Sequence, residues 1–267
     1  MSGVITLVRH SLRRWRGFFS ATAIVLIAVQ FFMILAARSL ELSGRFRLVE
    51  AVMPAFMAQW TNMMAASFAG FVLFGYSHPL VQLFLVATAI GIGSEPAAEI
   101  DTKFIDLLMA RPLARSVAIN RTLVMLVLVA AGAIVCMVGA TWGGLRLLAP
   151  ASARLPHARV VASLAANLAF LVLAWGGVAL ALASLSKRRA TVAAACGLLA
   201  FAMFVLDYVG RFWDAVIPFA RVSPFHYFDP FAMIGGRPLP ATDLVTLFAI
   251  FLAGAVIANV AYARRDL

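Results

Sequence analysis

The chain has 267 residues, of which 64% are hydrophobic and only 12% are charged. A water-facing surface needs about 25% charged residues, so this composition excludes a soluble globular protein and predicts apolar spans of about 20 residues in lipid. The formal net charge of +11 comes from short basic clusters between apolar runs, which favours positive-inside membrane topology over nucleic-acid binding.

Residues 1–16 are predicted to form an amphipathic helix on the inner leaflet, where anionic lipid attracts its arginines. Its apolar face would hold Val4, Val8, Leu12 and Trp15. The first span is predicted at Gly17–Ala37. This run is longer than the core of a signal peptide, and no small-residue cleavage pattern follows it, so we expect the span to be retained.

The stretch Ala51–Ser94 has no Asp, Glu, Lys or Arg and is too long for one ordinary span. Its second part, Pro79–Ser94, is predicted to be the inner end of a span. The first part, Met53–Phe74, is more polar at its centre. It is open to three interpretations: a surface helix, a re-entrant helix or a separate span.

Four further apolar runs are predicted spans: Thr122–Leu145, Val160–Ser186, Ala190–Leu206 and Leu244–Ala263. Six spans with both termini inside place more Lys and Arg on the inner side than seven spans do. The predicted fold is therefore an all-α polytopic transmembrane bundle, with one domain over 1–267 and both termini cytoplasmic. Its longest outer loop, 207–243, is rich in aromatic residues and proline.

Motifs for catalysis are missing from the sequence. Neither lysine, Lys103 or Lys187, follows a glycine as a P-loop requires, and the four histidines lack metal-ligand spacing. We therefore expect no catalytic residues, no metal ligands and no cofactor in this chain. The predicted spans contain no charged residue or histidine, which argues against a proton-driven carrier and leaves the energy to a separate subunit.

Four amides within the predicted spans have two possible roles, as hydrogen-bonding groups between helices or as substrate contacts that line a pathway. They are Gln30, Gln82, Asn167 and Asn259, of which Gln82, Asn167 and Asn259 are the predicted pathway residues.

The inner segment 95–115 is predicted to begin with a short amphipathic helix. Ser94 would cap it, Pro96 suits its first turn, and Pro112 would end it near Arg111. An apolar ridge would hold Ile100, Phe104, Leu107 and Leu108, with Thr102, Lys103 and Asp106 on another face. Two interpretations remain open, a surface helix that anchors the next span and a docking element for a partner.

Three stretches together resemble the permeases of type-2 ATP-binding-cassette (ABC) exporters, of the kind that serve nitrous-oxide-reductase maturation and multidrug export. They are E-I-D-T-K-F-I-D-L-L-M-A-R-P-L-A-R-S from Glu99, S-P-F-H-Y-F-D-P from Ser223 and A-R-R-D-L from Ala263. The chain departs from the family at Asp101 and Thr102, near which many relatives have a glycine and this chain has none.

The resemblance implies a permease driven by a separate cytosolic ABC ATPase, which would bind ATP and Mg. It also implies a second permease copy, most simply in a homodimer, together with export as the direction and the bacterial inner membrane as the location. The residues that would couple to the ATPase are Glu99, Lys103, Phe104, Asp106, Leu107, Leu108 and Arg111.

Two other functions remain as alternatives. An integral-membrane enzyme or maturation factor acting on lipid-like substrates would need a polar cluster near one membrane face. The candidates for such a cluster are Asp207, Arg211, Asp214, Arg221, His226 and Asp229. A passive channel or carrier is disfavoured by the lack of charge within the predicted spans.

Overall fold

The computed structural model describes residues 2–45, 67–103 and 116–264, and all regular structure in these ranges is helical. Six helical stretches there are long and apolar enough to span a membrane. They are α1 (Ser2–Ser43), α4 with α5 (Phe68–Ser77 and Pro79–Gly93), α8 (Ser116–Leu148), α9 (Ala158–Leu185), α10 (Arg189–Gly210) and α13 (Ala241–Ala263). The predicted all-α, polytopic membrane bundle is confirmed.

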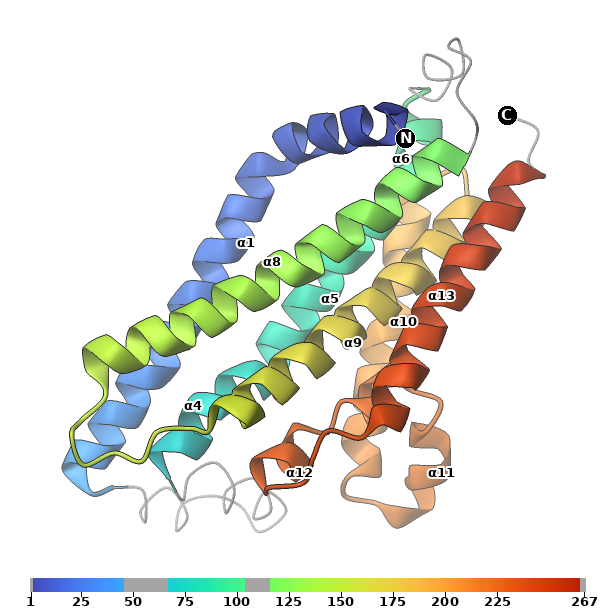
Figure 1. The fold of residues 1–267 in the computed structure, drawn as a ribbon. Coiled ribbons are helices and arrows are strands. Elements are labelled where there is room, and N and C mark those ends of the chain that lie inside the picture. The colour runs from blue at the N-terminus through green and yellow to red at the C-terminus, as the bar shows by residue number, and fades with distance from the viewer. Residues whose placement is uncertain (1, 46–66, 104–115, 265–267) are drawn as a thin grey trace.

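Five short helices in the described ranges lie between the long ones. They are α6 (Glu95–Asp101), η2 (Asp214–Val216), α11 (Ile217–Ala220), η3 (Pro224–Tyr227) and α12 (Pro230–Ile234). In Figure 1, α6 lies at the end of the bundle where α1 begins and α13 ends, and α11 and α12 lie at the opposite end. This arrangement fits an even number of spans. We call the first end the α6 end.

The predicted surface helix 1–16 and the first span form one continuous helix, α1, which bends along its length (Figure 1). Gly17, at the predicted boundary, meets open space and does not interrupt the helix. A single glycine costs a helix only about 1 kcal/mol, so it does not by itself end one.

The second span runs from Phe68 to Gly93 and is broken in the middle, between α4 and α5. The end of the ambiguous stretch Met53–Phe74 therefore belongs to the same span as Pro79–Ser94, and residues 46–66 lie outside the described ranges. The expectation of spans without histidine is wrong here, because His78 lies at the break. Pro79 has no N–H to continue the helix, and the Val81 N–H donates to the His78 carbonyl. The Ser77 carbonyl accepts instead from the Gln82 side chain at 2.7 Å.

The other helices match the predicted spans closely but extend beyond most of them by one or two turns. α8 begins six residues before Thr122 and includes Arg121, while α10 and α13 include Asp207 and Asp243. An apolar run marks only the depth of the hydrocarbon, whereas the helix continues through the interface. The helices therefore carry charges that the predicted spans did not.

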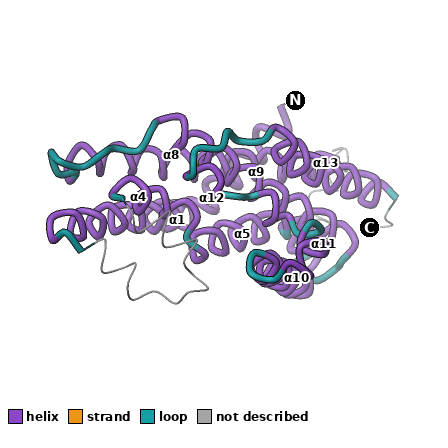
Figure 2. The backbone as a smooth tube through the Cα atoms, turned by 90° about the horizontal axis from the view of Figure 1, so that it is seen from below, coloured by secondary structure: helices purple, strands orange, loops and turns teal. Residues whose placement is uncertain are grey.

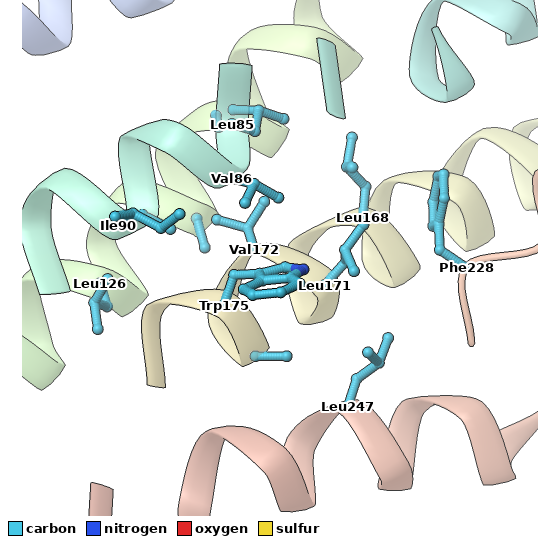
Figure 3. Close-up of a cluster of buried hydrophobic side chains, with 14 of the residues drawn as sticks. Leu85, Val86, Ile90, Leu126, Leu168, Leu171, Val172, Trp175, Phe228 and Leu247 are labelled. Carbon is cyan, nitrogen blue, oxygen red and sulfur yellow. The ribbon is translucent and has the colours of Figure 1, made fainter. Parts of the chain in front are cut away.

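The helix α9 is the centre of the bundle and packs against α13, α5, α8 and α10. Trp175 of α9 lies in the main core, with Val86 of α5 and Leu247 of α13 around it (Figure 3). Close backbone contact joins α9 to α13, because a Cβ at Gly254 would lie 2.3 Å from the Gly177 carbonyl oxygen. Small residues of this kind let membrane helices approach closely.

By contrast, α10 stands at the edge of the bundle beside α5 and α11 (Figure 2). It exposes large apolar side chains, as do the outer faces of α1, α8 and α13. Leu198, Phe32, Val135 and Val256 are examples. Contiguous surfaces of this kind contact lipid or another protein rather than water.

Candidate functional site

The short helix α6 follows α5 directly and lies against α8, α9 and α10 at the α6 end. Ser94 ends α5 and begins α6. Its hydroxyl donates back to the Gly91 carbonyl at 2.9 Å, so the predicted side-chain cap of α6 is wrong. Pro96 occupies the first turn as predicted. An N-cap residue normally has an extended backbone, whereas Ser94 has helical φ and ψ angles. Its hydroxyl therefore bonds to α5 and does not cap α6.

The inward face of α6 carries two glutamates. Glu99 is buried and accepts a hydrogen bond from Nη1 of Arg121, which is buried on α8. The other oxygen of Glu99 and the Nη2 of Arg121 have no partner among the described residues. The resemblance implied that Glu99 couples to an ATPase, whereas the structure places it in the interior, as half of a buried ion pair.

Glu95, one turn earlier on α6, is also buried, and one of its oxygens has no hydrogen-bond partner among the described residues. Burial raises the pKa of its carboxyl, and nearby arginines, Arg121 first, act against this rise. A cavity of about 10 Å³, the size of a single water, separates Glu95 from Ser11 and Trp15 of α1. The charge of Glu95 is thus poorly solvated and incompletely paired.

Arg189, at the start of α10, completes the group. Its guanidinium donates to the Gly91 carbonyl of α5 at 3.3 Å and lies 5.4 Å from the Trp15 ring of α1. Its backbone N–H donates to Asp101 of α6 at 3.4 Å. Glu95, Glu99, Arg121 and Arg189 form what we call the α6 cluster, which joins α6 to four of the six spans.

The helix α6 ends at Asp101, so the prediction that it continues to about Arg111 is wrong. Thr102 donates to the Ala98 carbonyl at 2.8 Å, and exposed Lys103 adopts a left-handed conformation with φ of 56°. Glycine takes this conformation most easily. Of the predicted coupling residues, Phe104, Asp106, Leu107, Leu108 and Arg111 lie outside the described ranges, and their role stays a prediction.

The three predicted pathway amides are all hydrogen-bonded. Gln82 bridges the break between α4 and α5, and the Asn167 side chain donates to the Tyr227 carbonyl of η3 at 3.1 Å. Asn259 donates to Ala255 in its own helix at 2.9 Å. Gln82 and Asn167 therefore each join two different elements through their amides, whereas Asn259 does not. A pathway role for these residues stays a prediction.

The residues proposed for an enzyme site come together only in part. Arg211 and Asp207 of α10 form an ion pair at 2.8 Å, Asp229 lies 3.7 Å from Arg211, and His226 Nδ1 lies 3.6 Å from Asp207. We call these four residues the loop cluster. Asp214 and Arg221 are exposed and take part in none of the ion pairs within the described ranges. The loop cluster ties α10 to η3 and α12, since Arg211 also donates to the Phe228 carbonyl at 3.1 Å.

Sequence reasoning missed the role of Arg121, which directly precedes the predicted span Thr122–Leu145. The signal available was weak: an isolated arginine directly before an apolar run resembles any positive-inside residue. Both cysteines are free, and the described residues hold no group of three His, Cys, Asp or Glu placed as metal ligands. No family model and no curated protein matches the chain.

Proposed function

We propose that this chain is the permease subunit of an ABC transporter, driven by a separate cytosolic ATPase. One observation carries the proposal. A short helix outside the apolar spans, α6, is fixed to α8 by the buried Glu99–Arg121 pair and to α10 and α5 through Arg189. When the segment that follows such a helix is displaced, the helix transmits the displacement to several spans.

The mechanism starts at the segment that follows α6, residues 103–111, which docks on the ATPase. ATP and Mg bind between two ATPase subunits, and closure of that dimer displaces the docked segment. Because an isolated buried ion pair has no alternative partner in a low-dielectric interior, α6 and the start of α8 move together. The spans then reorient and open the pathway toward the other side of the membrane, in the direction of export.

A second permease copy completes the pathway, since six spans are half of the number used by the family that the sequence resembles. The exposed apolar faces of α10 and α13 offer surfaces for this contact. The proposed location is the bacterial inner membrane, with the α6 end in the cytoplasm. This orientation agrees with the arginines of α1, Arg9, Arg13, Arg14 and Arg16, which lie near the same end.

An enzyme that acts on lipid-like substrates is the alternative, and the loop cluster is its candidate site. The contacts favour a structural role for that cluster. Asp207 is held by Arg211 at 2.8 Å, and Asp229 caps α12 by accepting from the Ala232 N–H at 3.3 Å. A general acid or base needs a carboxyl group that is free to reach the substrate.

Copurification tests the proposal. The tagged chain, extracted from its native membrane in mild detergent, is expected to bring down a protein with MgATP hydrolysis activity. Phe104→Asp with Leu108→Asp is expected to lose that partner. The control pair, Phe219→Asp with Val222→Asp, changes exposed apolar residues at the opposite end and should keep it. Copurification that is absent from the wild type, or unchanged in Phe104→Asp with Leu108→Asp, contradicts the proposal.

A further inference from the structure

An apolar groove lies between the N-terminal half of α1 and the middle of α8. Its volume is about 340 Å³, and it is lined along α1 from Leu12 to Leu26 and along α8 from Leu128 to Cys136. Figure 1 shows the cause, because α1 bends away from α8, which runs nearly straight. Small residues deepen the groove, among them Ala23 and Gly132. We call this feature the α1–α8 groove.

The length and the apolar lining of the groove suit a lipid acyl chain. From Leu12 to Leu26 the groove follows about 21 Å of helix, comparable with one leaflet of a hydrocarbon core about 30 Å thick. An apolar cavity of about 150 Å³ already binds benzene, so a groove of this size binds a flexible hydrocarbon.

A buried polar atom in the groove indicates that the occupant also carries oxygen. Thr22 lines the groove, is 6% exposed, and its hydroxyl has no hydrogen-bond partner among the described residues. A helical threonine usually donates to the carbonyl four residues earlier, as Thr88 and Thr122 do. The free hydroxyl is a donor for an acceptor such as an ester carbonyl.

Positive charge lies at one end of the groove. Arg9 and Arg16 lie fourteen and seven residues before Ala23, and residues seven positions apart share one face of a helix. Both arginines therefore lie on the face of α1 that lines the groove. Both are exposed, and the only acidic residue of α1 is Glu41, near its other end. The rings of Trp15, Phe18 and Phe19 contact one another on either side of Arg16, as expected of residues at headgroup depth.

We propose that the α1–α8 groove binds one anionic phospholipid from the leaflet at the α6 end. The acyl chain lies along Ala23 and Leu26 against α8, and the Thr22 hydroxyl donates to an ester oxygen at the start of that chain. Arg16, six residues before Thr22, binds the phosphate, and Arg9 adds positive charge further along the same face. A lipid so placed fills the space between α1 and α8 and holds the N-terminal part of α1 at the membrane surface. The site is independent of the transport proposal, because lipid binding needs no ATPase.

The test measures lipid that stays with the purified chain. The protein is reconstituted in vesicles of equal phosphatidylglycerol and phosphatidylcholine, extracted again in mild detergent, and its bound phospholipid is quantified by mass spectrometry. About one phosphatidylglycerol per chain is expected, preferred over phosphatidylcholine by about five- to thirtyfold from one or two juxtamembrane arginines.

Filling the groove gives the sharpest variant. A Cβ at Gly132 meets nothing within 4 Å, so Gly132→Leu fits without a clash, favours the helix and occupies the groove. About tenfold less bound lipid is expected, which corresponds to about 1.4 kcal/mol of binding. Gly139→Leu is the control, because Gly139 is also open on α8 but does not line the groove. It should retain lipid as the wild type does.

Two further variants separate the parts of the site. Arg9→Gln with Arg16→Gln should abolish the preference for phosphatidylglycerol, whereas Arg188→Gln with Arg264→Gln, exposed arginines at the same end, should preserve it. Thr22→Val should reduce bound lipid by about two- to tenfold through the loss of one hydrogen bond. Equal lipid in Gly132→Leu and Gly139→Leu would overturn the proposal. So would a change of oligomeric state in Gly132→Leu without lipid loss, which would assign the groove to a second copy.

Discussion

Two clusters of charge lie at opposite ends of this bundle and differ in how far they are removed from water. In the α6 cluster, the side chains of Glu99 and Arg121 are 2% and 5% exposed. In the loop cluster, the Arg211 side chain is 23% exposed and that of Asp229 is 46% exposed. The composition of the two clusters is similar, so burial rather than charge determines what each contributes.

The difference is one of rigidity. Water can reach Arg211 and Asp229 in the loop cluster, although Asp207 is buried. Glu99 is buried, and Arg121 is its single ion-pair partner among the described residues. A buried pair therefore joins two helices firmly, whereas a half-exposed one lets its loop rearrange. Four variants test this contrast, and we describe them from the largest expected effect to the smallest.

Removing one charge of the buried pair should have the largest effect. Arg121→Met leaves Glu99 charged and unpaired, and we expect a loss of about 3–5 kcal/mol in the free energy of unfolding. Thermal unfolding in detergent, followed by size-exclusion chromatography, measures it. The double variant Glu99→Leu with Arg121→Met should recover most of the loss, because no buried charge remains. A single variant as stable as the wild type would show that the pair is not desolvated.

Removing an arginine from the loop cluster should destabilise the protein less. Arg211→Ala removes the ion pair to Asp207 and the hydrogen bond to Phe228, and we expect a loss of about 1–2 kcal/mol because Arg211 is partly exposed. Thermal unfolding under identical conditions allows a direct comparison with Arg121→Met. A loss as large as that of Arg121→Met would remove the distinction between the two clusters.

Titration of Glu95 should make the α6 end sensitive to pH. Burial raises its pKa in the folded protein, so the folded state binds the proton more tightly than the unfolded state does. The contribution of Glu95 to the free energy of unfolding is fully present below its ordinary pKa of 4.5. This contribution decreases as the pH rises through the raised pKa of the folded state. Glu95→Gln removes this dependence.

Unfolding temperatures of the wild type and Glu95→Gln, compared from pH 4.5 upward, test this point. The variant should gain stability relative to the wild type as pH rises, and the gap should close toward pH 4.5. A gap that stays constant with pH would mean that the Glu95 carboxyl is solvated normally.

An exposed contact of the α6 end should matter least. Asp101 is exposed and accepts from the Arg189 N–H at 3.4 Å. We expect Asp101→Asn to change the free energy of unfolding by less than about 0.5 kcal/mol, although it lies beside the α6 cluster. A larger loss of stability, measured by thermal unfolding, would indicate that location at the α6 end, rather than burial, determines how much a residue contributes to stability.

The spans were predictable because the backbone in lipid has no water to bond with. A long apolar run must satisfy its own N–H and C=O groups, and a helix does so within one segment. α8, α9, α10 and α13 therefore fall on their predicted runs. The second span was harder, because the stretch Ala51–Ser94 has no Asp, Glu, Lys or Arg to mark where a helix begins. Pro79 indicated a boundary, and the structure places there a break within one span.

The α6 cluster was beyond the reach of sequence reasoning. The pattern around Ser94 and Pro96 predicted the start of α6, since those signals are local. The direction in which Glu99 faces depends on how α6 lies across α8, a contact between residues 22 positions apart that no periodicity encodes. The turn at Lys103 was also missed, because a lysine in a left-handed conformation has no signature in the sequence.

The most direct test of the proposed function is to determine which subunit hydrolyses ATP. The complex purified from native membranes through a tag on this chain should hydrolyse MgATP, and the chain stripped of its partners should have no such activity. Adding the partner back should restore hydrolysis to the complex and ATP-dependent transport to vesicles that contain it. Hydrolysis by the isolated chain, or transport in vesicles that hold it alone, would contradict a permease driven from outside through the α6 end.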